Sequence, residues 1–274
     1  PISPLPEQRA IVAKIEELFS DLDKGIADLN KAEYQLKVYR QAVLKKAFEG
    51  NWEVKCLGEV AKWGSGGTPS RRNSGFYTGN IPWLKTGELG GKYVSDAQEK
   101  ITEEAIKKSS AKIFPENSVG IAMYGATIGK TSIFTKSLST NQACAVAQPN
   151  ESIISEYLYY YLLSQKNDFI NKGKGGAQPN ISQTIIKAHP IPVPNIKEQH
   201  QIVQEIESRL SVCDNVELSI AESLEKAKAL RQSILKKAFE GSLLSVEELS
   251  ACKAAPDYEP ASVLLKKIKA EKKK

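Results

Sequence analysis

The heptapeptide LKKAFEG occurs twice in the chain, at Leu44–Gly50 and again at Leu235–Gly241. At this offset of 191 residues, positions 1–50 align with positions 192–241 without a gap and share 19 identical residues. A repeat of this kind determines the architecture of the whole chain. The sequence therefore consists of one segment, a unique central region, and the same segment again.

Both copies of the repeat are predicted to form long helices. An apolar residue or a cysteine recurs at every seventh position, which is typical of a coiled-coil seam rather than of a surface helix. Each copy follows a proline-rich stretch and ends at a glycine, as helices commonly do. The predicted seam consists of Ile15, Leu22, Leu29, Leu36 and Val43 in the first copy and Ile206, Cys213, Ile220, Ala227 and Ile234 in the second.

The order of the segments determines how these helices would pair. The first leads into the central region and the second leads out of it, so a pair between them is antiparallel, with the central domain at one end. A helix of about 40 residues is about 60 Å long, which suits a spacer or a partner-binding strut. The alternative is a helical core of an ordinary domain, but nothing else in the chain is long enough to cover it.

The central region is predicted to be a mixed α/β domain. Its strand candidates are Val119–Met123, Ile128–Phe134 and Ala143–Ala147, and Ser155–Gln165 has the pattern of a tyrosine-rich amphipathic helix. Glycine-bearing loops are expected at Gly64–Arg72, Gly87–Lys92 and Lys172–Asn180. The expected fold class is therefore α+β, with one mixed α/β domain on a long antiparallel two-helix coiled coil. The expected parts are residues 1–50 (first helix), 51–190 (central domain), 191–241 (second helix) and 242–274 (Lys-rich tail).

The positive charge of the chain is concentrated in the central domain. The 274 residues include 38 Lys and Arg against 32 Asp and Glu, a net charge of +6, and residues 51–188 alone carry +5. A basic middle between neutral flanks indicates an anionic partner such as nucleic acid. An excess of this size is also common in domains that bind no anion.

The sequence indicates no membrane span and no metal or cofactor site. No stretch approaches the roughly 18 uncharged apolar residues of a transmembrane helix, and the first residues lack the pattern of a signal peptide. The four cysteines form no C-x-x-C pair and have no histidine at metal-ligand spacing. We therefore expect a protein of the reducing cytoplasm, with no membrane partner, no metal and no cofactor.

The sequence contains no convincing catalytic motif. Gly125–Thr131 resembles a phosphate-binding loop, but three residues separate its glycines where four are needed, and an extended pattern follows in place of a helix. We expect a tight turn between two strands, with Lys130 exposed at its tip. Neither His189 nor His200 has a serine or cysteine arranged for nucleophilic catalysis.

Several motifs of the central domain closely resemble the target recognition domain of type I restriction–modification specificity (S) subunits. They are Gly66–Ser70, Gly79–Leu89, Gly125–Lys130, Asn141-Gln142 and Gln178–Ser182. The segments Leu5–Gly50 and Ile196–Gly241 look like the two conserved spacer regions of that family, and Glu259–Leu265 is similar to the end of S subunits. The resemblance covers nearly the whole chain.

The resemblance implies a non-catalytic subunit. Members of the family read an interrupted DNA sequence through two recognition domains on an antiparallel helix pair, and they recruit methyltransferase (M) and restriction (R) subunits. This chain has both spacer helices but one recognition domain, so we expect a half-length subunit that reads half of a site. Two copies joined at the helix ends that lack a recognition domain would form a homodimer. The alternatives are a coiled-coil protein-interaction adaptor with no DNA role, and a nucleotide hydrolase built on Gly125–Thr131.

Candidate DNA contacts lie in and beside the glycine loops. Lysine and arginine would contact phosphates, arginine can also read guanine, and side-chain amides can read adenine. The candidates are Thr68, Arg71, Arg72, Lys85, Lys130, Lys172, Lys174, Gln178 and Asn180. For each basic residue, an ordinary solvated side chain is an equally open interpretation.

Overall fold

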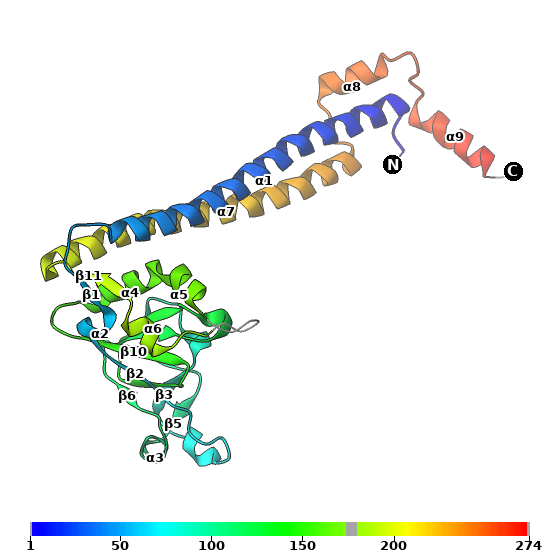
Figure 1. Cartoon of the computed structure of the whole chain (residues 1–274). Helices are drawn as coiled ribbons and strands as arrows, with labels where there is room; N and C mark the ends of the chain where they lie inside the picture. Colours follow the sequence, from blue (N-terminus) through cyan, green and yellow to red (C-terminus); the bar gives the residue numbers. More distant parts are fainter. Residues whose placement is uncertain (1, 174–179, 273–274) are drawn as a thin grey trace. The chain divides into compact units, whose positions relative to one another are not determined.

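The computed structural model describes residues 2–173 and 180–272 (Figure 1). Its contacts form two compact units, one with the residues up to Val38 and those from Val212 onward, the other with Tyr39–Ser211. Both long helices, α1 (Leu5–Ala47) and α7 (Ile196–Glu240), run through the two units. The expected four-part division of the chain remains a prediction, because the units divide each long helix within its length.

In the first unit, α1 and α7 lie side by side and antiparallel (Figure 1). Arg231 of α7 pairs with Asp23 of α1, with Nη1 and Oδ1 3.0 Å apart, and its guanidinium lies 4.5 Å from the ring centre of Phe19. Further along α1, Leu29 lines the same groove as Ile220. Residue numbers rise along one helix as they fall along the other, so the long helix pair is antiparallel, as expected.

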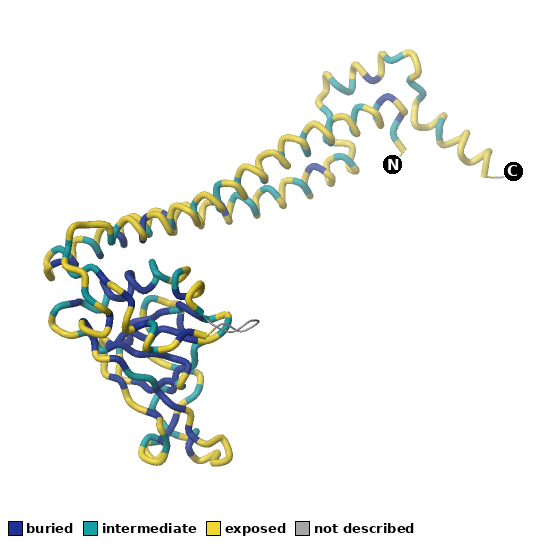
Figure 2. The backbone as a smooth tube through the Cα atoms, viewed as in Figure 1, coloured by how far each residue is buried: buried dark blue, intermediate teal, exposed yellow. Residues whose placement is uncertain are grey.

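The predicted seam positions are all buried or half-buried. Figure 2 shows buried or intermediate stretches alternating with exposed ones along both helices. A pair of helices covers its seam from one side only, so partial burial is expected of many of these residues. Cys213, Ile220 and Ile234 are buried in the first unit, as are Val43 and Ile206 in the second, while Ile15, Leu22, Leu29, Leu36 and Ala227 are half-buried.

The tail adds two helices to the first unit, α8 (Val246–Lys253) and α9 (Ala261–Glu271). A capping box of Ser245 and Glu248 opens α8, which satisfies amide groups at its N-terminus. Lys14 of α1 lies 3.5 Å from the Glu248 carboxylate, and the Cys252 thiol lies 3.8 Å from the Pro6 carbonyl. Thus α8 packs beside the first turns of α1.

The second unit contains the central domain, built on two main sheets. The first has the strand order β2 (Ala61–Ser65), β10 (Cys144–Pro149), β7 (Val119–Ala122), β8 (Thr131–Phe134) and β4 (Tyr93–Val94). The second has the order β5 (Lys100–Ile101), β3 (Ile81–Leu84), β9 (Leu138–Thr140) and β6 (Ile113–Phe114). The strands β1 (Val54–Cys56) and β11 (Pro190–Pro192) pair where the chain enters and leaves the domain.

Short helices connect these strands. They are α2 (Leu57–Val60), α3 (Glu103–Lys107), α5 (Lys166–Lys172) and α6 (Gln183–Lys187), with 3₁₀ turns η1 (Ser74–Tyr77), η2 (Thr86–Glu88) and η3 (Gly125–Thr127). The mixture of sheets and helices beside a long helix pair confirms the α+β class.

Helix α4 (Ser155–Ser164) forms much of the core, where it packs against β7 and β8. Its residues Tyr157–Leu162 are all buried, as is Trp83 of β3. The Phe48 ring meets Tyr157 and Tyr161 edge-on, with ring centres 5.1 and 5.2 Å apart. Aromatic edge-to-face contacts of this kind fix the end of α1 on the domain.

The turn after β7 differs from the sequence-based expectation in two ways. The expected strand Ile128–Phe134 begins only at Thr131, because the preceding residues complete the turn. Gly129 has a φ of +77° and packs against Lys166, which a side chain would not allow. Lys130 is half-buried rather than exposed at the tip, and its carbonyl accepts a hydrogen bond from Ala122 N at 2.8 Å. The expected loop Gly64–Arg72 also begins later, because Gly64 and Ser65 belong to β2.

Candidate nucleic-acid interface

The chain leaves β2 and β7 and enters β10 at one edge of the first sheet, the edge formed by these strand ends. In the antiparallel ladders, Ser65 lies opposite Ala145 and Ala122 lies opposite Cys144. The ends of β2 and β7 therefore lie beside the start of β10. The residues just outside these strand ends come together at one site.

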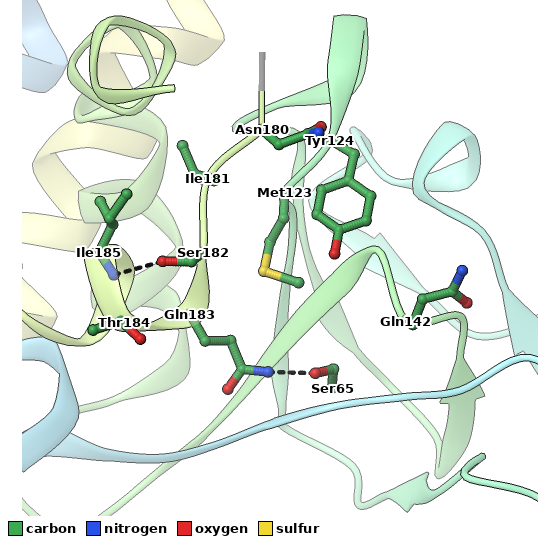
Figure 3. Close-up of a pocket in the computed structure, with 10 residues that line it drawn as sticks. All are labelled: Ser65, Met123, Tyr124, Gln142, Asn180, Ile181, Ser182, Gln183, Thr184 and Ile185. Carbon is green, nitrogen blue, oxygen red and sulfur yellow. Dashed lines mark hydrogen bonds between the residues drawn. The ribbon is translucent and has the colours of Figure 1, made fainter. Parts of the chain in front are cut away.

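An open pocket of about 800 Å³ lies at this edge (Figure 3). Its lining combines an apolar base with hydroxyl and amide side chains. The polar residues are Ser65, Tyr124, Gln142, Asn180, Ser182, Gln183 and Thr184. Base edges in DNA are read by such neutral donors and acceptors, so this lining suits direct readout.

Hydrogen bonds hold several of these side chains in place. Gln183 Nε2 is bonded to Ser65 Oγ, which ties the start of α6 to the end of β2. The Gln142 side chain is bonded to the Thr68 hydroxyl. Asn180 forms an antiparallel backbone bridge to Tyr124. The pocket therefore presents ordered amides, although Thr68, Gln142 and Asn180 themselves are exposed.

Two glycines allow the loop after β2 to approach the second sheet. A Cβ at Gly66 would lie 1.8 Å from the Thr140 carbonyl oxygen, and one at Gly67 would lie 2.2 Å from Ser110 Oγ. Gly67 N donates to the same Thr140 carbonyl at 3.0 Å. The Gly-Gly pair is required by this close contact of backbone with backbone.

Arg71 belongs to a charged and aromatic cluster at the far end of the same loop. Its Nη1 lies 2.6 Å from Glu99 Oε2, and its guanidinium lies 4.1 Å from the ring centre of Tyr77 and 5.1 Å from that of Trp83. Lys85 pairs with the other carboxylate oxygen of Glu99. Hydrogen bonds from Arg71 and then Lys85 lower the pKa of Glu99.

The loop itself connects the pocket with this cluster. Trp83 Nε1 donates to the Gly67 carbonyl at 2.9 Å, and the Tyr77 hydroxyl donates to the Pro69 carbonyl at 2.6 Å. Arg71 is therefore held in an exposed, stacked position by a tethered loop. Its neighbour Arg72 is exposed as well.

Lys172 has a different environment from these residues. Its Nζ lies 2.6 Å from Asp168 Oδ2 and 3.1 Å from His189 Nδ1. His189 is buried between Tyr161 and Phe169, and burial, followed by the charge of Lys172, lowers its pKa. Lys172 thus ties the end of α5 to the segment before β11.

The structure brings only some of the predicted contacts together. Thr68 and Asn180 lie at the pocket and its rim, Arg71 and Lys85 share Glu99, and Lys174 and Gln178 lie outside the described residues. Sequence reasoning missed Ser65, Tyr124, Gln142 and Gln183. For Gln142 a signal existed, because the Asn141-Gln142 pair was among the motifs of the resemblance.

Residues 2–173 and 180–272 contain neither a membrane-spanning helix nor a metal-binding cluster. None of the helices described there is long and apolar enough to cross a membrane. In the same ranges, no three His, Cys, Asp or Glu side chains lie close enough together to hold a metal ion.

The family model for the type I restriction modification DNA specificity domain matches residues 49–226. The chain belongs to this family. The match confirms the resemblance seen in the sequence, and it covers the pocket, the Arg71 cluster and the start of α7.

Curated relatives of the chain are named as specificity subunits of type I restriction enzymes. The specificity subunit of the type I restriction enzyme EcoR124I/EcoR124II from Escherichia coli is 33% identical over 228 residues, which are 81% of this chain and 55% of that protein. The EcoBI specificity subunit from Escherichia coli is 25% identical over 308 residues, covering 99% of this chain and 64% of that protein. The chain thus spans about half to two thirds of the length of these two relatives.

Solved structures share the fold. A chain from a type I R-M system matches with a TM-score of 0.73 at 24% identity, covering 86% of this chain and 60% of that one. The HsdS subunit from Thermoanaerobacter tengcongensis matches with a TM-score of 0.61 at 24% identity, covering 89% and 60%. Both support the arrangement of a mixed α/β domain with long helices.

Proposed function

We propose that this chain is a non-catalytic, DNA-reading specificity subunit of a type I restriction–modification complex. The observation that carries the proposal is the match of the DNA specificity domain over residues 49–226. The same region contains the basic block of the chain and a pocket lined by ordered amides. The names of the curated relatives agree with a specificity role rather than a catalytic one.

The Arg71 cluster and the pocket would have different roles in DNA binding. Arg71 and Arg72 are exposed cations suited to phosphates, which supply affinity and set the register. Gln142, Gln183 and Asn180 at the pocket offer donors and acceptors to base edges, which supply sequence preference. Lys85, which pairs with Glu99 as Arg71 does, is a further cation for a phosphate.

The partners follow from the family. With one recognition domain among the described residues, the chain would read one half of an interrupted double-stranded site and recruit M and R subunits, in the cytoplasm. We also propose the four-part division of the chain, with boundaries at residues 50, 190 and 241.

A homodimer joined through the first unit is a further possible arrangement of this subunit. Light scattering of the chain alone tests whether it forms.

The other candidate functions are less well supported. An adaptor without a DNA role does not account for the match to a DNA specificity domain. A nucleotide hydrolase would need a helix after Gly125–Lys130, where the chain instead enters strand β8.

Fluorescence anisotropy with a labelled duplex at increasing salt tests the proposal. We expect the logarithm of the affinity to fall by about 0.9 per log unit of salt for each phosphate contact. Changing Arg71 and Arg72 together to Glu should lower the affinity by about tenfold or more. The control changes Lys107 and Lys112 to Glu, since both are exposed in the same domain and alter the charge equally. A DNA affinity that changes neither with salt nor with the two arginine substitutions would refute the proposal.

A further inference from the structure

The pocket at the edge of the first sheet is lined by neutral side chains. The ten described residues that line it include no lysine, arginine, aspartate or glutamate. The cations Arg71 and Lys85 do not line the pocket and are both paired with Glu99. A base edge that enters this pocket would therefore meet amides, hydroxyls and apolar groups.

This lining favours one kind of base pair, because the bases differ in the side chains that read them. Guanine is read mostly by arginine or lysine, and the N4 amino group of cytosine by aspartate or glutamate. Adenine is read by a side-chain amide on N6 and N7, and the methyl group of thymine by an apolar side chain. An A·T pair therefore requires an amide beside an apolar surface.

Asn180 is the amide of the pocket that is placed for such a contact. Its backbone bridges Tyr124, and the next residue, Ile181, donates its N–H to the Met123 carbonyl at 2.9 Å. The Asn180 side chain is exposed, and within the described part of the chain neither its Nδ2 nor its Oδ1 has a hydrogen-bond partner. Asn180 can thus offer a donor and an acceptor together from a fixed backbone.

The two glutamines of the pocket are each engaged at one end of the amide. Gln142 accepts a hydrogen bond from the Thr68 hydroxyl with its Oε1, whereas Gln183 donates from its Nε2 to Ser65 Oγ. Neither glutamine presents a whole amide while these bonds last. Each can add a single hydrogen bond, but the bidentate contact to adenine belongs to Asn180.

The apolar surface of the pocket lies beside this asparagine. Met123 and Ile181 are 4% and 2% exposed, and Ile185 is half-buried. Figure 3 shows Met123 below Asn180, next to the ring of Tyr124. Because the thymine methyl group and adenine N6 both project into the major groove, an amide and an apolar surface side by side match the two bases of one pair.

We propose that this pocket reads an A·T base pair through the major groove. Asn180 contacts adenine N6 and N7, and Met123 and Ile185 contact the methyl group of thymine. A guanine in place of the adenine would set its O6 against Asn180 Oδ1, so that two acceptors would face each other. The inference rests on the proposed function, since it names the base pair that the DNA-reading domain prefers at this pocket.

Base analogues that change a single group test the inference. The full chain, assembled with a methyltransferase subunit, first selects its preferred duplex from a random pool. Anisotropy then compares that duplex with copies in which each adenine in turn is 7-deazaadenine, which lacks N7, or each thymine is uracil, which lacks the methyl group. At one A·T pair we expect 7-deazaadenine to weaken binding about fivefold, and uracil about fourfold.

Substitutions in the protein connect these effects with the pocket. Asn180→Ala should weaken binding to the unmodified duplex and abolish the effect of 7-deazaadenine at that pair. Ile185→Ala should abolish the effect of uracil there. Asn167→Ala is the matched control, because Asn167 is an exposed asparagine of the same domain that does not line the pocket. It should leave both effects unchanged.

Three results would overturn the inference and leave the proposed function standing. The preferred duplex could contain no A·T pair, the effect of 7-deazaadenine could persist in the Asn180 variant, or 3-deazaadenine alone could weaken binding, which would mean reading through the minor groove. In each case the chain still selects a sequence. A pool with no preferred sequence would contradict both the inference and the proposed function.

Discussion

Arg71 is ion-paired with Glu99, with Nη1 and Oε2 2.6 Å apart, on the exposed face of the recognition domain. The carboxylate also pairs with Lys85, so one negative charge restrains two cations. An approaching phosphate would compete with Glu99 for both. Glu99 thus orders Arg71 and at the same time limits its attraction for DNA.

Replacing Glu99 by Gln should therefore strengthen DNA binding. The loss of one negative charge leaves Arg71 and Lys85 for phosphates, and we expect a gain of about threefold with a steeper salt dependence. Glu104→Gln is the control, because Glu104 pairs with Lys108 in the same way on an exposed helix. Weaker binding by the Glu99 variant would contradict this prediction. It would mean that the ordering of Arg71 by Glu99 favours DNA binding more than the negative charge of Glu99 opposes it.

His189 should make the stability of the second unit depend on pH. Burial lowers its pKa in the folded state, so on acidification the unfolded chain takes up the proton first. The stability is thus full above the ordinary pKa of about 6.5 and is lost as pH falls below it. His189→Gln should flatten this part of the curve in denaturant titrations. An unchanged slope in the His189 variant would contradict the assignment.

Gly66 should tolerate no side chain. Gly66→Ala places a methyl group against the Thr140 carbonyl, so we expect a loss of about 2 kcal/mol or more in the free energy of unfolding. Gly87→Ala is the matched control, because no atom outside Gly87 and its two chain neighbours lies within 4 Å of a Cβ built there. Chemical denaturation compares the two, and equal midpoints would show that the loop can move away from the second sheet.

Leu29 tests the helix pair in the first unit. Leu29→Asp puts a charge beside Ile220 in the groove between α1 and α7, and should cost about 2 kcal/mol. Asn30→Asp introduces the same charge at the exposed neighbouring position and should change little. Circular dichroism melts measure both variants, and the coiled-coil interpretation fails if their midpoints coincide.

The sequence predicted the features that depend on period and repetition. Seven-residue spacing and the repeat indicated the long antiparallel pair, and a tyrosine-rich pattern indicated α4. Lys130 was misplaced because its burial depends on tertiary contacts, such as the approach of its Cδ to Gly90, which sequence spacing does not contain. The pocket was missed for a similar reason: Ser65, Gln142 and Gln183 are far apart in the chain and meet only through the register of the sheet.

Selection of duplexes from a random pool tests the central claim, sequence-specific reading of DNA by the recognition domain. The full chain, assembled with a methyltransferase subunit, should enrich one short defined sequence. Gln142→Ala and Gln183→Ala should alter that sequence, while the Lys107 and Lys112 control should retain it. A pool that shows no preferred sequence after selection with the unaltered chain would contradict the account.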